Sequence, residues 1–267
     1  SIIIITHKLE EVMAVTDNVT IMRQGRMVGN VRTSDTSVGA LAAAMVGRAV
    51  NLHRDVSTGK PNTTICREVA GLNVHPRDRA NPTLREVSLT VRGGEIVGIA
   101  GVEGNGQKEL FDALMRVRQR GARERGRIAI LQQAASALST GQVRSLSLGV
   151  IPYDRHEEGL LLDESARDNC MLGRHHRSPF ARRSILNLRA IDSWCDRVFE
   201  GFDVQPKQPL NRIRGYSGGN QQKLIVGREL IGKPAFVIAA NPIRGVDVGA
   251  IEFIHQHKKS LVSQREV

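Results

Sequence analysis

The residues best suited to chemistry are residues 216–223, Tyr-Ser-Gly-Gly-Asn-Gln-Gln-Lys, in which two glycines follow a hydroxyl residue and precede a helix-forming run. A Ser-Gly-Gly turn that opens a helix points backbone N–H groups outward at the positive helix end, and this arrangement binds phosphate. Ser217 adds a hydroxyl donor, and Gly218 and Gly219 let an anion approach the backbone closely. The alternative is a capped helix without a ligand.

A second glycine-rich loop, residues 101–108, has the spacing G-x-x-G-x-G and lies between a predicted buried strand (95–100) and a predicted helix (107–115). This is the context of a phosphate-binding loop, whose backbone N–H groups cradle phosphates. The candidate nucleotide-binding residues are Gly101, Glu103, Gly104, Asn105, Gly106, Gln107 and Lys108. A glycine-rich loop that never binds nucleotide is the alternative.

Two side chains of this loop depart from the usual pattern. Gln107 stands where a lysine reaches the β- and γ-phosphates, and Lys108 stands where a Ser or Thr holds Mg²⁺. Lys108 lies about 100° further around the helix, so it is a poor replacement for the missing lysine. The buried strand predicted at 236–240 also lacks side chains that such a nucleotide site needs. In the Walker B pattern, a strand of this kind ends in Asp and Glu, but here Ala240 and Asn241 occupy those positions.

Composition limits the classes of function. The net charge is +11, while aromatic residues make up only 3%, so a stacking platform for single-stranded nucleic acid is not expected. The three cysteines are far apart and lack metal-type spacing, which is typical of reduced thiols. No apolar run has the length of a membrane span or the pattern of a signal peptide.

The remaining patterns predict the elements that position these loops. Residues 1–6 predict a central parallel strand with His7 at its end. A helix (8–16), a strand pair (19–22 and 27–31) and a second helix (38–46) follow. Further predictions are strands at 68–74 and 84–91, a strand and loop at 148–154, and helices at 166–172 and 191–199.

The stretch 216–223 is similar to the signature motif of ATP-binding cassette (ABC) ATPases, in the wording typical of sugar and nucleoside importers. Residues 6–12, Thr-His-Lys-Leu-Glu-Glu-Val, resemble the switch-histidine loop that comes late in such a cassette, and residues 22–26 resemble the hairpin after it. Residues 151–155, Ile-Pro-Tyr-Asp-Arg, match the region of the family's glutamine loop but contain no Gln.

This resemblance implies an α/β fold with a mostly parallel P-loop core, an antiparallel β subdomain and a helical signature subdomain at about 161–214. Residues 1–50 would be the tail of a first cassette, 51–65 a linker, and 66–267 a second cassette truncated at its end. We therefore expect a fragment of a longer, tandem-cassette polypeptide. Residues 1–48 could dock where the missing tail belongs, placing residues 2–5 beside the strand at 236–240.

In the family, each nucleotide lies between one cassette's phosphate loop and the other's signature. The resemblance therefore implies that the signature serves ATP and Mg²⁺ held by the first cassette, mostly outside this chain. The residues assigned to that catalytic site are His7, Ser217, Gly218, Gly219, Gln221 and Asp247. The chain's own loop would be degenerate, and the chain alone inactive as an ATPase.

The implied partners are transmembrane permease subunits and, indirectly, a solute-binding protein, at the cytoplasmic face of the bacterial inner membrane; no nucleic acid is expected. Two alternatives stay open. One is a non-hydrolysing remnant or regulatory module, favoured by the loss of the two acids at Ala240 and Asn241 and by chain ends that look cut. The other is a DNA-associated cassette ATPase, favoured by the charge of +11.

Overall fold

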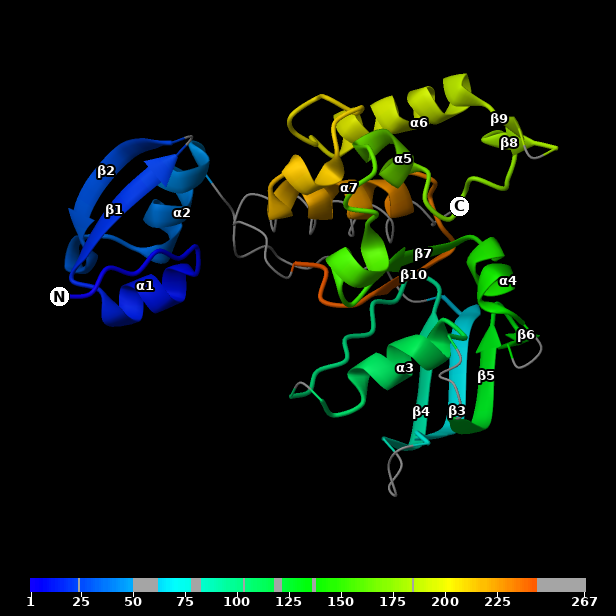
Figure 1. Cartoon of the computed structure of the whole chain (residues 1–267). Coiled ribbons are helices and arrows are strands. Elements are labelled where there is room, and N and C mark those ends of the chain that lie inside the picture. The colour runs from blue at the N-terminus through cyan, green and yellow to red at the C-terminus, as the bar shows by residue number, and fades with distance from the viewer. Residues whose placement is uncertain are drawn as a thin grey trace. The chain divides into compact units, whose positions relative to one another are not determined.

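The computed structural model describes residues 1–267 except 24, 50–61, 78–82, 103, 118–121, 136–137, 184 and 244–267. The chain divides into two compact units, with Ser1–Ser57 in the first and Thr58–Pro242 in the second. Figure 1 colours the first unit blue and the second from cyan to orange.

The first unit builds a small apolar core from two helices and an antiparallel strand pair. Its elements are α1 (Leu9–Val15), β1 (Asn18–Arg23), β2 (Arg26–Arg32), the 3₁₀ turn η1 (Thr33–Asp35) and α2 (Val38–Val46). Its core consists of Leu9, Val12, Ile21, Leu41 and Ala42. Ser37 caps α2 by accepting from the Ala40 N–H, and Gly47 ends it in the left-handed conformation. The predicted helix–hairpin–helix sequence is confirmed.

The strand predicted at residues 1–6 is wrong. These residues form no regular structure, and Ile2, Ile3 and Ile5 are 88%, 91% and 97% exposed. A β-branched run forms a central strand only where neighbouring strands accept its hydrogen bonds, and no described strand pairs with it. The docking of residues 1–48 onto the other unit stays a prediction.

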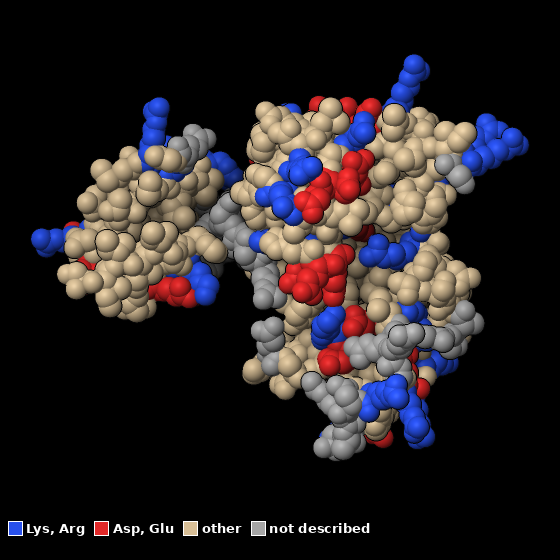
Figure 2. All heavy atoms as spheres, in the orientation of Figure 1, with Lys and Arg blue, Asp and Glu red and all other residues tan. Residues whose placement is uncertain are grey.

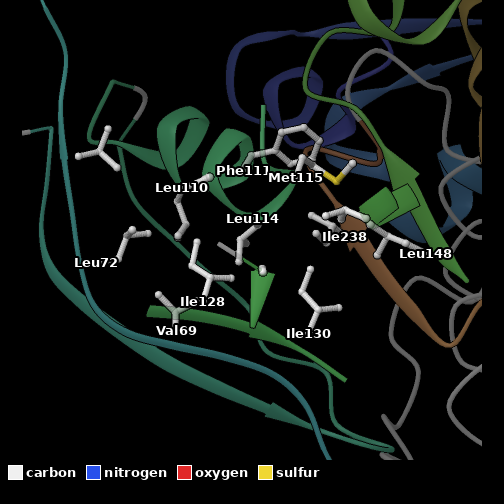
Figure 3. Packing of buried hydrophobic residues seen from close by; sticks show 14 of the residues in the cluster. Val69, Leu72, Leu110, Phe111, Leu114, Met115, Ile128, Ile130, Leu148 and Ile238 are labelled. Atoms are coloured by element: carbon white, nitrogen blue, oxygen red, sulfur yellow. The ribbon is translucent and has the colours of Figure 1, made fainter. Parts of the chain in front are cut away.

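The second unit contains a four-stranded antiparallel sheet in the order β4-β3-β5-β6. Its strands are β3 (Ile65–His75), β4 (Leu84–Arg92), β5 (Arg123–Ile130) and β6 (Gln133–Ala134). Helix α3 (Gln107–Leu114) packs on this sheet, and Figure 3 shows Leu110 and Leu114 directed toward Val69 and Ile128. The same core includes Leu148 and Ile238, so it joins the sheet to the parallel strands described next.

The parallel part of the core is a pair of strands. Helix α4 (Thr140–Ser145) precedes β7 (Leu148–Ile151), which pairs with β10 (Phe236–Ala239). The buried strand predicted at 95–100 is wrong, because this segment is irregular and Ile96, Val97 and Ile99 are 58%, 40% and 55% exposed. An apolar run alone does not make a strand, and no described strand pairs with this one.

A group of helices completes the second unit. It comprises the π-helical turn η3 (Arg155–Gly159), α5 (Ala166–Cys170), the hairpin β8 (Ala181–Arg182) and β9 (Ile185–Leu186), α6 (Leu188–Gly201), the 3₁₀ turn η4 (Ile213–Gly215) and α7 (Gly218–Leu230). Gly227 allows α6 and α7 to approach closely, because a Cβ there would lie 2.9 Å from Val198 and Phe202 side-chain atoms. Among the described helices, none is long and apolar enough to cross a membrane.

Candidate functional site

One cavity of about 330 Å³ brings together three segments that the sequence singles out. Gly101 and Gln107 come from the glycine-rich loop, Tyr153 follows β7, and Ala240 and Asn241 follow β10. Ile99, Leu110, Phe111, Leu114, Ile238 and Ala239 complete the lining. None of these described lining residues carries a charged side chain, so the cavity has neither a lysine for phosphate nor a carboxylate for a metal.

The glycine-rich loop ends at Gly106, the N-cap of α3, with a φ of 95°. A Cβ at this position would lie 2.8 Å from the carbonyl oxygen of Thr83. Both the left-handed conformation and this close approach require glycine. The loop therefore leads into the N-terminal end of α3, as the sequence predicts.

The Gln107 side chain is folded back onto its own loop. Its Nε2 donates to the carbonyl oxygen of Val102 at 2.8 Å, and a Cβ on Gly101 would lie 2.5 Å from the same nitrogen. Its Oε1 is buried and has no hydrogen-bond partner among the described residues. The amide thus closes a hydrogen bond across the loop, between the first residue of α3 and Val102.

Lys108 is directed toward the turn η3. Its Nζ lies 2.7 Å from Glu158 Oε1 and 3.7 Å from Asp112 Oδ2. The hydrogen bond to Glu158 raises the pKa of Lys108 against the opposing effect of partial burial, with a further contribution from Asp112. The ammonium is therefore committed to carboxylates and does not line the cavity.

The residues around the cavity do not fit Mg²⁺. Hard cations prefer several oxygen ligands, usually including a carboxylate, and the two candidate positions hold Ala240 and Asn241. The described residues also contain no group of three or more His, Cys, Asp and Glu side chains that could hold a metal.

The signature stretch forms the N-terminus of α7. Ser217 is the N-cap, and its Oγ accepts from the Asn220 N–H at 3.4 Å and from Asn220 Nδ2 at 3.0 Å. Ser217 is exposed and Gly218 is half-buried. Because Oγ acts as an acceptor within the chain, its proton remains available for donation, alongside the first N–H groups of the helix. The structure thus brings Ser217, Gly218 and Gly219 together at one helix end.

Gln221 has a supporting position. Its side chain is buried, and Nε2 donates to the carbonyl oxygens of Ile213 and Tyr216, each at 3.2 Å. Its Oε1 lies 3.0 Å from Nε2 of His156 in η3. Gln221 therefore fixes the turn before α7 and links it to the segment after β7.

Tyr216 closes the turn from the other side. Its hydroxyl donates to the carbonyl oxygen of Gln208 at 2.7 Å, and its ring packs edge-on against Phe199 with centroids 6.3 Å apart. Burial, with a smaller contribution from the nearby Cys195, raises the pKa of Tyr216 to about 12.

A buried ion pair anchors the other end of α7. Arg228 Nε lies 3.1 Å from Glu229 Oε1, and the two residues are 3% and 5% exposed. Glu229 Oε2 accepts from the Val150 N–H at 3.1 Å, and Arg228 Nη1 donates to the Asn169 carbonyl at 3.1 Å. The pair ties α7 to β7 and α5.

His7 is exposed and belongs to the first unit, so its pairing with Ser217 stays a prediction. Glu103 and Asp247 lie outside the described residues.

The sequence did not predict the residues that contact Gln221, Lys108 and Arg228. These residues are His156, Glu158 and Glu229, respectively. His156 and Glu158 directly follow the segment 151–155, and this position was the only signal for them.

Comparison with known proteins gives a consistent result. Residues 84–244, more than half of the chain, match the family model described as ABC transporter. The chain is 35% identical over 266 residues to a nucleoside import ATP-binding protein (NupA) of Lactococcus lactis, covering 100% of this chain and 51% of that protein. It is 38% identical to a glucose import ATP-binding protein (TsgD13) of Haloferax volcanii, and the match covers 99% of this chain and 47% of that protein. The chain thus spans about half the length of these curated relatives.

The fold also has solved counterparts. A dimeric ATP-binding cassette in a post-hydrolysis state, bound to ADP and Pi, superposes with a TM-score of 0.62 at 18% identity, covering 74% of this chain and 83% of that one. This likeness shows the cassette fold. Together with the family match and the signature turn at the start of α7, it shows that the chain belongs to the ABC transporter family.

Proposed function

We propose that this chain is part of the ATP-binding subunit of a bacterial importer for simple sugars or nucleosides, in which ATP binding and hydrolysis drive transport. The family and the names of the relatives support this proposal. In it, residues 1–50 are the tail of a first cassette, 51–65 a linker, and 66–267 the second cassette, with the helical subdomain at about 161–214. The partners are permease subunits and, through them, a solute-binding protein, at the cytoplasmic membrane face.

The observation that carries the proposal is the contrast between the two phosphate-type sites. The signature end is complete, because Ser217 caps α7 and is exposed. The local cavity lacks charge, because Gln107, Ala240 and Asn241 line it. The signature therefore serves a nucleotide held by the first cassette, where His7, Ser217 and the helical N–H groups stabilise charge on the transferred phosphoryl group.

ATP hydrolysis in trans tests this proposal. The purified chain alone should hydrolyse no ATP, whereas mixing it with a first cassette that carries G-x-x-G-x-G-K-[ST] and Asp-Glu motifs should produce hydrolysis. Ser217→Ala should lower that rate by about 10²- to 10³-fold, which is the usual effect of removing one hydrogen-bond donor that stabilises negative charge in a transition state. Ser145→Ala removes another exposed hydroxyl in the same unit and serves as the control.

Two outcomes would contradict the proposal. One is steady hydrolysis by the chain alone that Ser217→Ala abolishes. The other is an equal effect of both serine substitutions on the mixed reaction.

The second candidate is a non-hydrolysing module. The Gln107 amide folded onto Val102 favours it, since this conformation obstructs the phosphate loop. Failure of the chain to stimulate an intact first cassette, with no nucleotide bound by the chain in equilibrium dialysis, would support this candidate over the first.

A further inference from the structure

The β8–β9 hairpin carries a surface that neither the signature nor the cavity uses. This hairpin patch consists of Arg182, Arg183, Ile185, Leu186, Leu188 and Arg189, all of them exposed. Ile185, Leu186 and Leu188 are 75%, 44% and 53% exposed. Figure 2 shows basic side chains projecting from the end of the second unit where Figure 1 places β8 and β9.

The sequence segment that contains the hairpin patch carries charge of one sign. Residues 172–190 contain five arginines and two histidines but no aspartate or glutamate. The next acidic residue along the chain is Asp192, and its Oδ1 pairs with Nη1 of Arg167 at 3.3 Å. Among the described residues, none of the three patch arginines forms an ion pair with a carboxylate. Their charge is therefore available to an external anion.

The chemistry of the hairpin patch distinguishes among anionic partners. Single exposed aliphatic residues are common on protein surfaces, but three beside three unpaired arginines form a mixed surface. Arginines with exposed aliphatic residues suit the interface of a bilayer, where the charges meet lipid phosphates and the aliphatic groups reach the acyl boundary. Single-stranded nucleic acid would favour aromatic side chains. The patch has none, and the chain's one tryptophan, Trp194, is buried between Arg174 and Arg197.

We propose that the hairpin patch binds directly to bilayer surfaces that contain anionic lipids. The guanidinium groups contact lipid phosphates, and Ile185, Leu186 and Leu188 enter the boundary between headgroups and acyl chains. This contact goes beyond the proposed transport function and does not depend on it, because it needs no nucleotide and no permease.

Vesicle co-sedimentation of the full chain tests the electrostatic part. The chain should bind vesicles of phosphatidylcholine mixed with phosphatidylglycerol and not vesicles of phosphatidylcholine alone. The double variant Arg182→Glu/Arg183→Glu should weaken binding at least about tenfold, given the contribution expected from each basic residue near an anionic surface. The matched control Arg123→Glu/Arg125→Glu makes the same charge change at exposed positions of β5 and should change binding less than about twofold.

A second variant tests the apolar part while keeping every charge. Ile185→Ser/Leu186→Ser should weaken binding by about fivefold or more, from the loss of buried apolar area. Circular dichroism of each variant confirms that it is folded. Three results would overturn the proposal: equal binding to both vesicle types, equal losses in the two arginine double variants, or duplex DNA binding that depends on Arg182 and Arg183 while vesicle binding does not.

Discussion

Helices α3 and α7 both begin at a glycine-rich turn, yet their surroundings differ. In α7, ten of thirteen residues are buried, and the buried side chains of Gln221, Gln222, Arg228 and Glu229 all have hydrogen-bond partners. Around α3, the packing is also close, with five of eight residues buried. There, however, Gln107 Oε1 and two nitrogens of Arg67 are buried without a partner among the described residues.

This difference indicates which interactions hold the N-terminal end of each helix. Polar partners have directions, so a satisfied network fixes the N-terminus of α7 in one geometry. Apolar packing positions α3, and in its loop the Gln107 amide is held by one hydrogen bond to Val102. The signature end is therefore held by a polar network, whereas the loop before α3 is mostly exposed and only its last residue, Gly106, is buried.

Arg228→Ala should have the largest effect, because it leaves Glu229 buried without its counterion. We expect the free energy of unfolding to fall by about 3–5 kcal/mol, measured by urea denaturation. The control Arg214→Ala removes an exposed pair with Asp163, whose members are 57% and 68% exposed, and should cost at most about 1 kcal/mol. Equal losses in the two variants would show that the polar network behind α7 does not set its stability.

Arg67→Met should act in the opposite direction near α3. Arg67 is 1% exposed, donates to the Leu114 carbonyl and lies over the Phe236 ring. Burial, with the nearby positive charge of Arg116, lowers the pKa of Arg67 to about 10, so it is still charged at neutral pH. Removing this buried charge should outweigh the lost hydrogen bond and raise the free energy of unfolding by about 1–2 kcal/mol. A loss in the same denaturation experiment would mean that the guanidinium is better compensated than its contacts indicate.

Gly106→Ala tests the backbone of the phosphate-type loop. The φ of 95° and the Thr83 carbonyl 2.8 Å from an added Cβ should cost about 1–3 kcal/mol of unfolding free energy. Gly141→Ala in α4, where an added Cβ meets no atom within 4 Å, should be neutral or slightly stabilising. If Gly106→Ala behaves like this control in thermal unfolding, the loop is not held in the conformation described.

The smallest effect concerns Tyr216 and depends on pH. Its raised pKa means that the folded chain keeps the phenol proton at a pH where the unfolded chain, near its ordinary value of 10, has lost it. The stabilisation is therefore fully present below pH 10 and is lost as the pH rises through about 12. Tyr216→Phe should be less stable than the parent at pH 8 by about 1 kcal/mol, and this gap should narrow above pH 10. A gap that stays constant with pH in matched denaturation curves would contradict this assignment.

Local patterns predicted most of the elements. The helices α1, α2, α3, α6 and α7 and the strands β3, β4, β7 and β10 follow from periodicity and capping residues. The strands expected at 1–6 and 95–100 fail because an apolar run becomes a strand only beside a partner, which local sequence does not specify. The contacts Lys108–Glu158 and His156–Gln221 join residues 50 and 65 positions apart, so no local pattern could predict them.

The hydrogen bond from Gln107 to the Val102 carbonyl has a kinetic consequence. We expect a phosphate bound by this loop to require rotation of the amide, and in that case the observed association rate should level off as ligand concentration rises. The apparent dissociation constant is the intrinsic one divided by the fraction of molecules with the amide turned out, so an open fraction of about one tenth weakens binding about tenfold. If the proposed nucleotide binding extends to this loop, the conformation of a single side chain lowers its apparent affinity.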